Sequence, residues 1–248
     1  MMITELLRIY QDSLINPGRP ECTFAPTVIF NEGWLLRAVL REWKTCVHPG
    51  PLGFLPFPED AQLYSEGQLY TPFGARYRGD KQAESHTHAD GIVGHFSILD
   101  TKSGIVLNHN FSYFAVFEAK LSSPLSAHTT NATEYDQVTR TVACMINVIL
   151  QSGRSEGYAA HFVVLSPRTN HFVSPVNDSK AVVADQLAHR MAMYDSIAEN
   201  KQGASLFAQQ WRRVLDRLQL SFVTWEDVLD VIANNELNRF YALCLRFN

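Results

Sequence analysis

The sequence has few cysteines, and they lie far apart in the chain. Its four cysteines are Cys22, Cys46, Cys144 and Cys244. No two of them form a C-x-x-C pair, so the spacing argues against a structural zinc site built on cysteine. Disulfide bonds are not expected in a reducing compartment.

Long apolar runs are also missing. No run reaches the roughly 18 residues that a membrane-spanning helix needs. Residues 1–8 lack the layout of a signal peptide. We therefore expect a cytoplasmic protein with no membrane segment.

The chain carries no excess of positive charge. Its 21 Lys and Arg residues face 25 Asp and Glu residues, which gives a net charge of −4. This total argues against a protein coated in basic residues, although a local basic groove is compatible with it. With 248 residues, of which 46% are hydrophobic, the chain is expected to form a single domain over residues 1–248.

The most informative stretch covers residues 111–120, whose aromatic and β-branched residues predict a strand. Both alternating faces are mostly apolar, which predicts a central strand. Glu118 and Lys120 fall on one face where the strand ends. Burying charges without partners costs several kcal/mol, so we expect other polar groups to meet them. An apolar setting would also allow the pKa of Lys120 to fall.

A second predicted strand, residues 90–98, begins with Asp90 and is expected to return through a turn at 100–104 as an antiparallel partner. That pairing would place Asp90 opposite Glu118 and Lys120. Two carboxylates beside one cation suit Mg²⁺ or Mn²⁺, which would be bound by one or two carboxylates and water. Lys120 would then orient or activate the nucleophile.

Asp90-Gly91 and Glu118-Ala119-Lys120 resemble the PD-(D/E)XK nuclease superfamily, which has the restriction-endonuclease-like fold. The resemblance implies metal-dependent hydrolysis of phosphodiester bonds, with DNA as the expected partner. In that reading, Asp90 and Glu118 bind the metal and Lys120 acts on the attacking water. A homodimer is compatible with it, because two sites could then address two strands.

The order of predicted elements agrees with this resemblance. A helix over residues 28–44, strands at 62–73, 90–98 and 111–120, a helix at 134–152 and a strand at 157–165 give an α-β-β-β-α-β core. This core would span residues 28–165, with a mixed central sheet flanked by helices. Residues 170–248 are expected to be a mainly helical C-terminal extension.

Two further residues receive roles from the resemblance. Glu32, near the start of the first core helix, would support the metal site, although the helix dipole alone also favours an acid there. Gln137, near the start of the helix after the Glu-x-Lys strand, would serve the site as an auxiliary catalytic residue. Thr141 stands where that helix often carries a tyrosine.

Three other interpretations compete with the nuclease. The chain could be a non-catalytic member of the same fold that acts through protein contacts. His86-x-His88-x-Asp90 resembles the zinc-binding run of the metallo-β-lactamase fold and would indicate a zinc hydrolase. Finally, Glu118 and Lys120 could be only an ion pair at a strand end.

Overall fold

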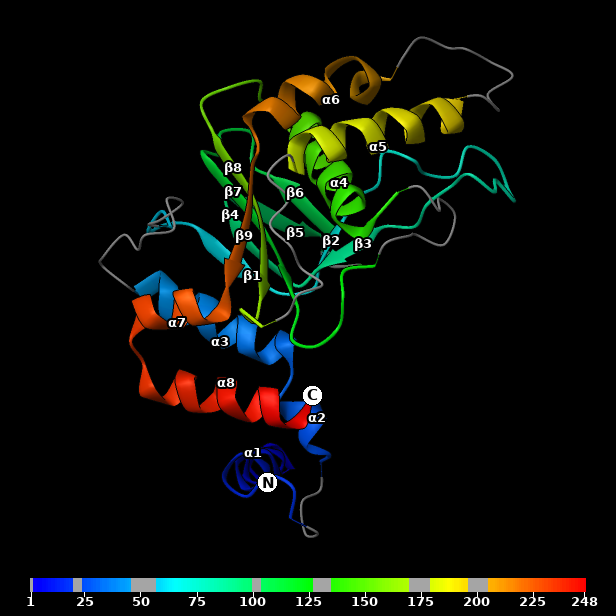
Figure 1. Ribbon diagram of the computed structural model, residues 1–248. Helices are drawn as coiled ribbons and strands as arrows, with labels where there is room; N and C mark the ends of the chain where they lie inside the picture. Colours follow the sequence, from blue (N-terminus) through cyan, green and yellow to red (C-terminus); the bar gives the residue numbers. More distant parts are fainter. Residues whose placement is uncertain are drawn as a thin grey trace.

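The protein is an α/β protein built around a mixed β-sheet (Figure 1). The computed structural model describes residues 2–19, 24–45, 57–99, 104–126, 135–169, 179–195 and 205–248. No helix among these residues combines the length and apolar character that crossing a membrane requires.

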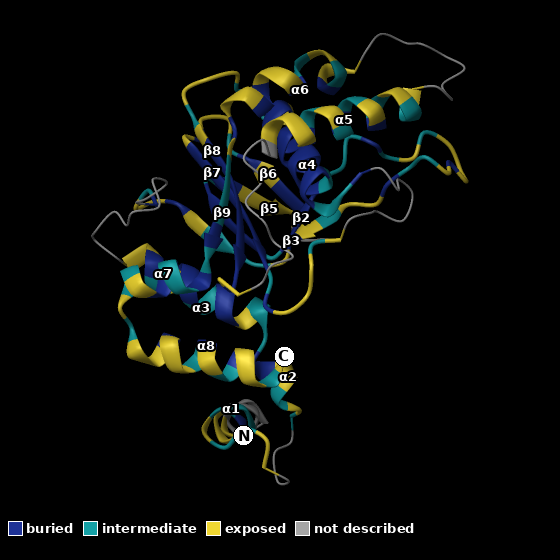
Figure 2. Cartoon of the chain, viewed as in Figure 1, coloured by how far each residue is buried: buried dark blue, intermediate teal, exposed yellow. Residues whose placement is uncertain are grey.

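The main sheet has five strands in the order β1-β4-β7-β8-β9. Their bounds are β1 Gln62–Tyr64, β4 Gly91–Gly94, β7 Tyr113–Ala119, β8 Ala159–Ser166 and β9 Gln219–Thr224. β1, β4 and β7 pair antiparallel, whereas β7, β8 and β9 pair parallel. All seven residues of β7 are buried, and Figure 2 shows the same for the middle of the sheet. The predicted central strand is thus confirmed.

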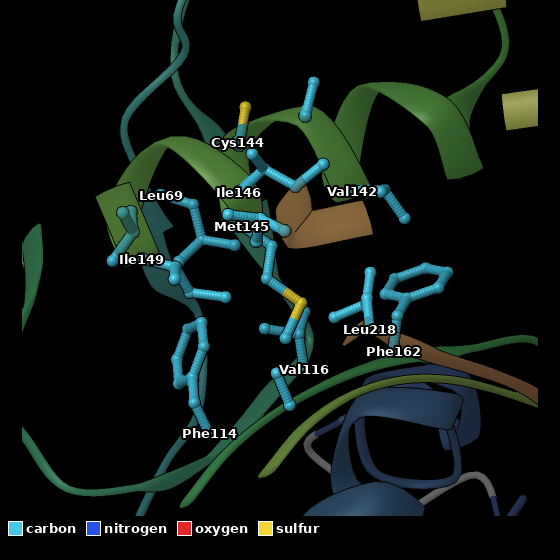
Figure 3. Packing of buried hydrophobic residues seen from close by; sticks show 14 of the residues in the cluster. Leu69, Phe114, Val116, Val142, Cys144, Met145, Ile146, Ile149, Phe162 and Leu218 are labelled. Carbon is cyan, nitrogen blue, oxygen red and sulfur yellow. The ribbon is translucent and has the colours of Figure 1, made fainter. Parts of the chain in front are cut away.

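Helices cover both faces of this sheet (Figure 1). One face is covered by α4 (Gln137–Gln151), against which α5 (Ser179–Asp195) and α6 (Leu206–Arg217) pack. Met145 and Ile149 of α4 lie against Phe114 and Val116 of β7 (Figure 3). The apolar spacing of α4 therefore faces the sheet, as its sequence predicts.

The opposite face packs on α3 (Glu32–Thr45) and α7 (Trp225–Ile232), with α8 (Asn235–Phe247) against α3. The short α2 (Pro26–Ile29) contacts α8, and α1 (Met2–Ile15) contacts α2. The predicted helix at 28–44 begins at Glu32, because the Asn31 side chain caps it by accepting a hydrogen bond from the Trp34 amide at 3.0 Å.

A second sheet, which the sequence analysis did not anticipate, has the order β3-β2-β6-β5. Its strands are β2 Gly67–Leu69, β3 Thr87–Ala89, β5 Phe96–Leu99 and β6 Gly104–Leu107. The predicted strand at 62–73 therefore divides into β1 and β2, and the one at 90–98 into β4 and β5.

The predicted turn at 100–104 does not lead directly into the central strand. Residues 100–103 lie outside the described residues, and β5 pairs with β6 before the chain reaches β7. Gly94 lies at the end of β4, where a Cβ would come within 2.5 Å of the Tyr113 carbonyl oxygen. Only glycine allows the two strands to approach this closely.

When only α3, α4 and the strands of the main sheet are counted, the order α3-β1-β4-β7-α4-β8 matches the predicted one, but β2, β3, β5 and β6 of the second sheet lie between these elements in the chain. The C-terminal region differs in one respect, because it contributes β9 to the main sheet next to β8. It is therefore part of the sheet as well as a set of helices packed on it.

Candidate active site

Asp90 lies beside the end of β7, as the sequence analysis predicted. Gly91 pairs with Phe117 in the antiparallel register, which places Asp90 level with Glu118. The Asp90 carboxylate accepts a hydrogen bond from the Ala119 amide at 2.8 Å. The backbone of β7 thus holds this carboxylate beside Glu118.

Gly91 explains how α3 packs so near to Asp90. A Cβ at Gly91 would lie 2.8 Å from Leu40 Cδ1 and 3.0 Å from Leu36 Cδ2, both on α3. Ile92 points to the other face and joins the α4 cluster. Because side chains alternate along a strand, Asp90 shares the face of Ile92, and Gly91 leaves room for α3 behind it.

Glu118, Lys120 and Gln137 meet at the end of β7. Glu118 is 3% exposed, and its Oε1 lies 2.9 Å from Lys120 Nζ. The same oxygen accepts a hydrogen bond from Gln137 Nε2. Gln137 is the first residue of α4, and its Oε1 accepts from the Ser126 amide at 3.3 Å. Three of the predicted site residues are therefore in direct contact.

Burial and neighbouring negative charges raise the pKa values of the two acids, Asp90 and Glu118. Burial, together with the negative charge of Glu118, raises the pKa of Asp90 from 3.8 to about 7. Burial also raises the pKa of Glu118, against the opposing effect of Lys120. Near neutral pH, Asp90 is therefore divided between its protonated and ionised forms.

The expected fall in the pKa of Lys120 was wrong. Burial does lower it, but the charges of Glu118 and Asp90 outweigh burial and the pKa of Lys120 is raised. The apolar strand was only part of its surroundings, because two acids also face it. Lys120 is therefore an ammonium ion at physiological pH.

Glu32 does not join Asp90 and Glu118 in a compact metal-binding group. Within the described ranges, no three His, Cys, Asp or Glu side chains are close enough to hold a metal ion. The reason is that Glu32 lies on α3, which packs on the face opposite to that of Glu118. Its charge still acts on Glu118 and Lys120 and raises the pKa of each.

The predicted zinc ligands are not assembled either. His86 and His88 are exposed and form no three-residue group with Asp90. The His86 ring instead packs edge-on against Tyr70, and His88 Nδ1 lies 3.3 Å from the Glu66 carbonyl oxygen.

Sequence reasoning overlooked Glu66, and for Arg37 it left two interpretations open, a solvated helix face and contact with a phosphate backbone. Arg37 Nη2 lies 3.3 Å from Glu66 Oε1. The charge of Glu66 contributes to the raised pKa of both Asp90 and Glu118. Neither residue belongs to a recognisable motif, and only the strand register brings Glu66 to this site.

Comparison of the chain with protein-family models, with curated proteins and with solved structures found no match.

Proposed function

We propose that the protein is a metal-dependent nuclease that hydrolyses phosphodiester bonds, with DNA as its substrate, and that it belongs to the PD-(D/E)XK type. The observation that carries the proposal is the Asp90 carboxylate, which is held by the Ala119 amide level with Glu118 and next to Lys120. The order α3-β1-β4-β7-α4-β8 supports a restriction-endonuclease-like fold.

Asp90 and Glu118 would hold Mg²⁺ or Mn²⁺, with water as the remaining ligands. The fit rests on their charges: burial raises the pKa of both carboxyl groups, and the charge of Glu118 adds to the rise at Asp90, so a divalent cation in place of the proton would stabilise the pair. When bound, such an ion lowers the pKa of its water and neutralises phosphoryl charge.

The chain's own groups would do the rest of the work. Lys120 stays protonated, so its ammonium group orients the attacking water and offsets charge on the phosphate, and it does not act as the base. Gln137 fixes the orientation of Glu118 through the hydrogen bond to Oε1. Loss of a supporting contact of this kind commonly lowers metal affinity or activity by about 10–100-fold.

One observation favours a second candidate, a non-catalytic protein of the same fold. Lys120 is already satisfied by its 2.9 Å contact with Glu118, and the described residues offer no third acid to a metal. In that case the cluster would only stabilise the end of β7, and the protein would act through protein contacts.

Cleavage assays separate the two candidates. Labelled single-stranded DNA, duplex DNA and RNA are incubated with the protein in Mg²⁺, in Mn²⁺ and in EDTA. We expect cleavage that depends on the metal. Each of the variants Asp90→Asn, Glu118→Gln and Lys120→Met should lower the cleavage rate at least about 100-fold, because each removes a group that stabilises the transition state. Glu59→Gln, which changes an exposed acid, is the matched control.

Cleavage that survives in all three site variants at the parental rate would refute the nuclease. If folded wild-type protein cleaves none of the substrates, the non-catalytic candidate is favoured.

A further inference from the structure

Glu66 lies level with two acids of the candidate site. Tyr64 pairs with Ile92 and Gly67 pairs with Ala89, so the register places Glu66 beside Asp90. Asp90 in turn is level with Glu118 on the next strand. Glu66 has a left-handed backbone with φ of 58° between β1 and β2. It therefore lies at the rim of the site, at a bend of the chain.

Arg37 lies on α3, on the face of the sheet opposite to that of Glu118, and its side chain reaches Glu66 at the bend between β1 and β2. The residue before it, Leu36, would contact a Cβ at Gly91, which adjoins Asp90. The side chains of Arg37 and Glu66 are 32% and 54% exposed, with Nη2 and Oε1 3.3 Å apart. The ion pair is thus open to solvent and to a substrate.

Trp34 orients the guanidinium group of Arg37. Arg37 Cζ lies 4.9 Å from the centre of the Trp34 ring, within the range of a cation–π contact. A guanidinium group presents a planar set of donors that fits a phosphate as well as a carboxylate. Arg37 is thus oriented for an anion, and Glu66 is the anion that it meets in this structure.

We propose that Arg37 binds a phosphate of the nucleic-acid strand, and that the Glu66 carboxylate holds this anion position until the phosphate displaces it. This inference rests on the proposed nuclease function. Exposed ion pairs contribute little, so a phosphate can replace Glu66 at low cost. The effect of the Glu66 charge on Asp90 and Glu118 supports its nearness to the site. Trp34 is a positioning residue for Arg37.

The test is fluorescence anisotropy of the full chain with a fluorescein-labelled DNA single strand and with the matching duplex. Ca²⁺ replaces Mg²⁺, and a gel verifies that the probes stay intact. Arg37→Gln is expected to weaken binding about tenfold and to reduce the salt dependence by about one phosphate contact. Glu66→Gln is expected to strengthen binding about two- to fivefold, the worth of an exposed ion pair.

Four further variants isolate the mechanism. The gain from Glu66→Gln should vanish in the Arg37→Gln background, since no cation is then released. Glu59→Gln removes an acid from the preceding segment and should give a smaller gain than Glu66→Gln. Trp34→Phe should keep the affinity that Trp34→Leu loses.

Wild-type affinity in Arg37→Gln, a Glu66→Gln gain that persists without Arg37, or no binding of either probe by the wild-type protein would each overturn the inference. Failure of the Arg37 inference can be told apart from failure of the proposed nuclease function. Metal-dependent cleavage that needs Glu118 but not Arg37 would remove only the role of Arg37.

Discussion

The raised pKa of Asp90 leads to a prediction about stability. In the folded protein this pKa is about 7, whereas its ordinary value is 3.8. The folded state therefore binds the proton more tightly than the unfolded state. The stability linked to this group is present below about pH 4 and is lost as the pH rises through 7. The difference between the two pKa values corresponds to about 4 kcal/mol.

Asp90→Asn should remove the loss of stability that the parent shows as the pH rises through 7. An asparagine can still accept the hydrogen bond from the Ala119 amide, and it carries no charge to repel Glu118. We expect the variant to be more stable than the parent at pH 8.5, by about 2–4 kcal/mol, and to lose most of this advantage at pH 4.5.

The assay is urea unfolding of both proteins at several pH values in EDTA, followed by tryptophan fluorescence and circular dichroism. Equal pH dependence of the two proteins between pH 4.5 and 8.5 would refute the argument, because the carboxyl group would then titrate alike in the folded and unfolded states. Adding Mg²⁺ at pH 8.5 should stabilise the parent and leave Asp90→Asn unchanged.

Three more outcomes follow from the packing and contacts. Gln137→Ala should lower Mg²⁺ affinity about tenfold or more, measured by calorimetry, with Gln137→Glu as a comparison that keeps the size. Gly91→Ala should destabilise the fold by about 1–3 kcal/mol in urea, because the new methyl group meets Leu40, and the same change should cost less in a Leu40→Ala background. Arg190→Met should cost about 3–5 kcal/mol, because it leaves Glu84 buried without the 2.6 Å partner that it has now. An exposed substitution such as Arg212→Met should change stability by less than about 0.5 kcal/mol.

The sequence allowed much of the main sheet to be predicted, because its signals are local. β7 is apolar on both faces, and α4 carries its apolar stripe at regular spacing. The Asp90–Glu118 juxtaposition followed from one assumption, that the two strands pair antiparallel, and the register confirms it.

The parts that could not be predicted depend on tertiary geometry. The second sheet arises where the chain bends at Glu66, a residue with no turn signature that nonetheless has a positive φ. Whether Glu32 could join the acids depended on which face α3 covers. The direction of the pKa shift of Lys120 depended on Glu118 and Asp90 together outweighing burial. The apolar pattern of a single strand contains none of this information.

The central claim is that Asp90 and Glu118 together hold a divalent cation, and a calorimetric titration with Mg²⁺ at pH 8 tests it most directly. We predict one binding site in the parent and in Glu59→Gln, and loss of that site in Asp90→Asn and in Glu118→Gln. Because Asp90 is partly protonated near pH 7, binding should also weaken as the pH is lowered from 8 to 6. Parental Mg²⁺ affinity in both site variants would contradict the account.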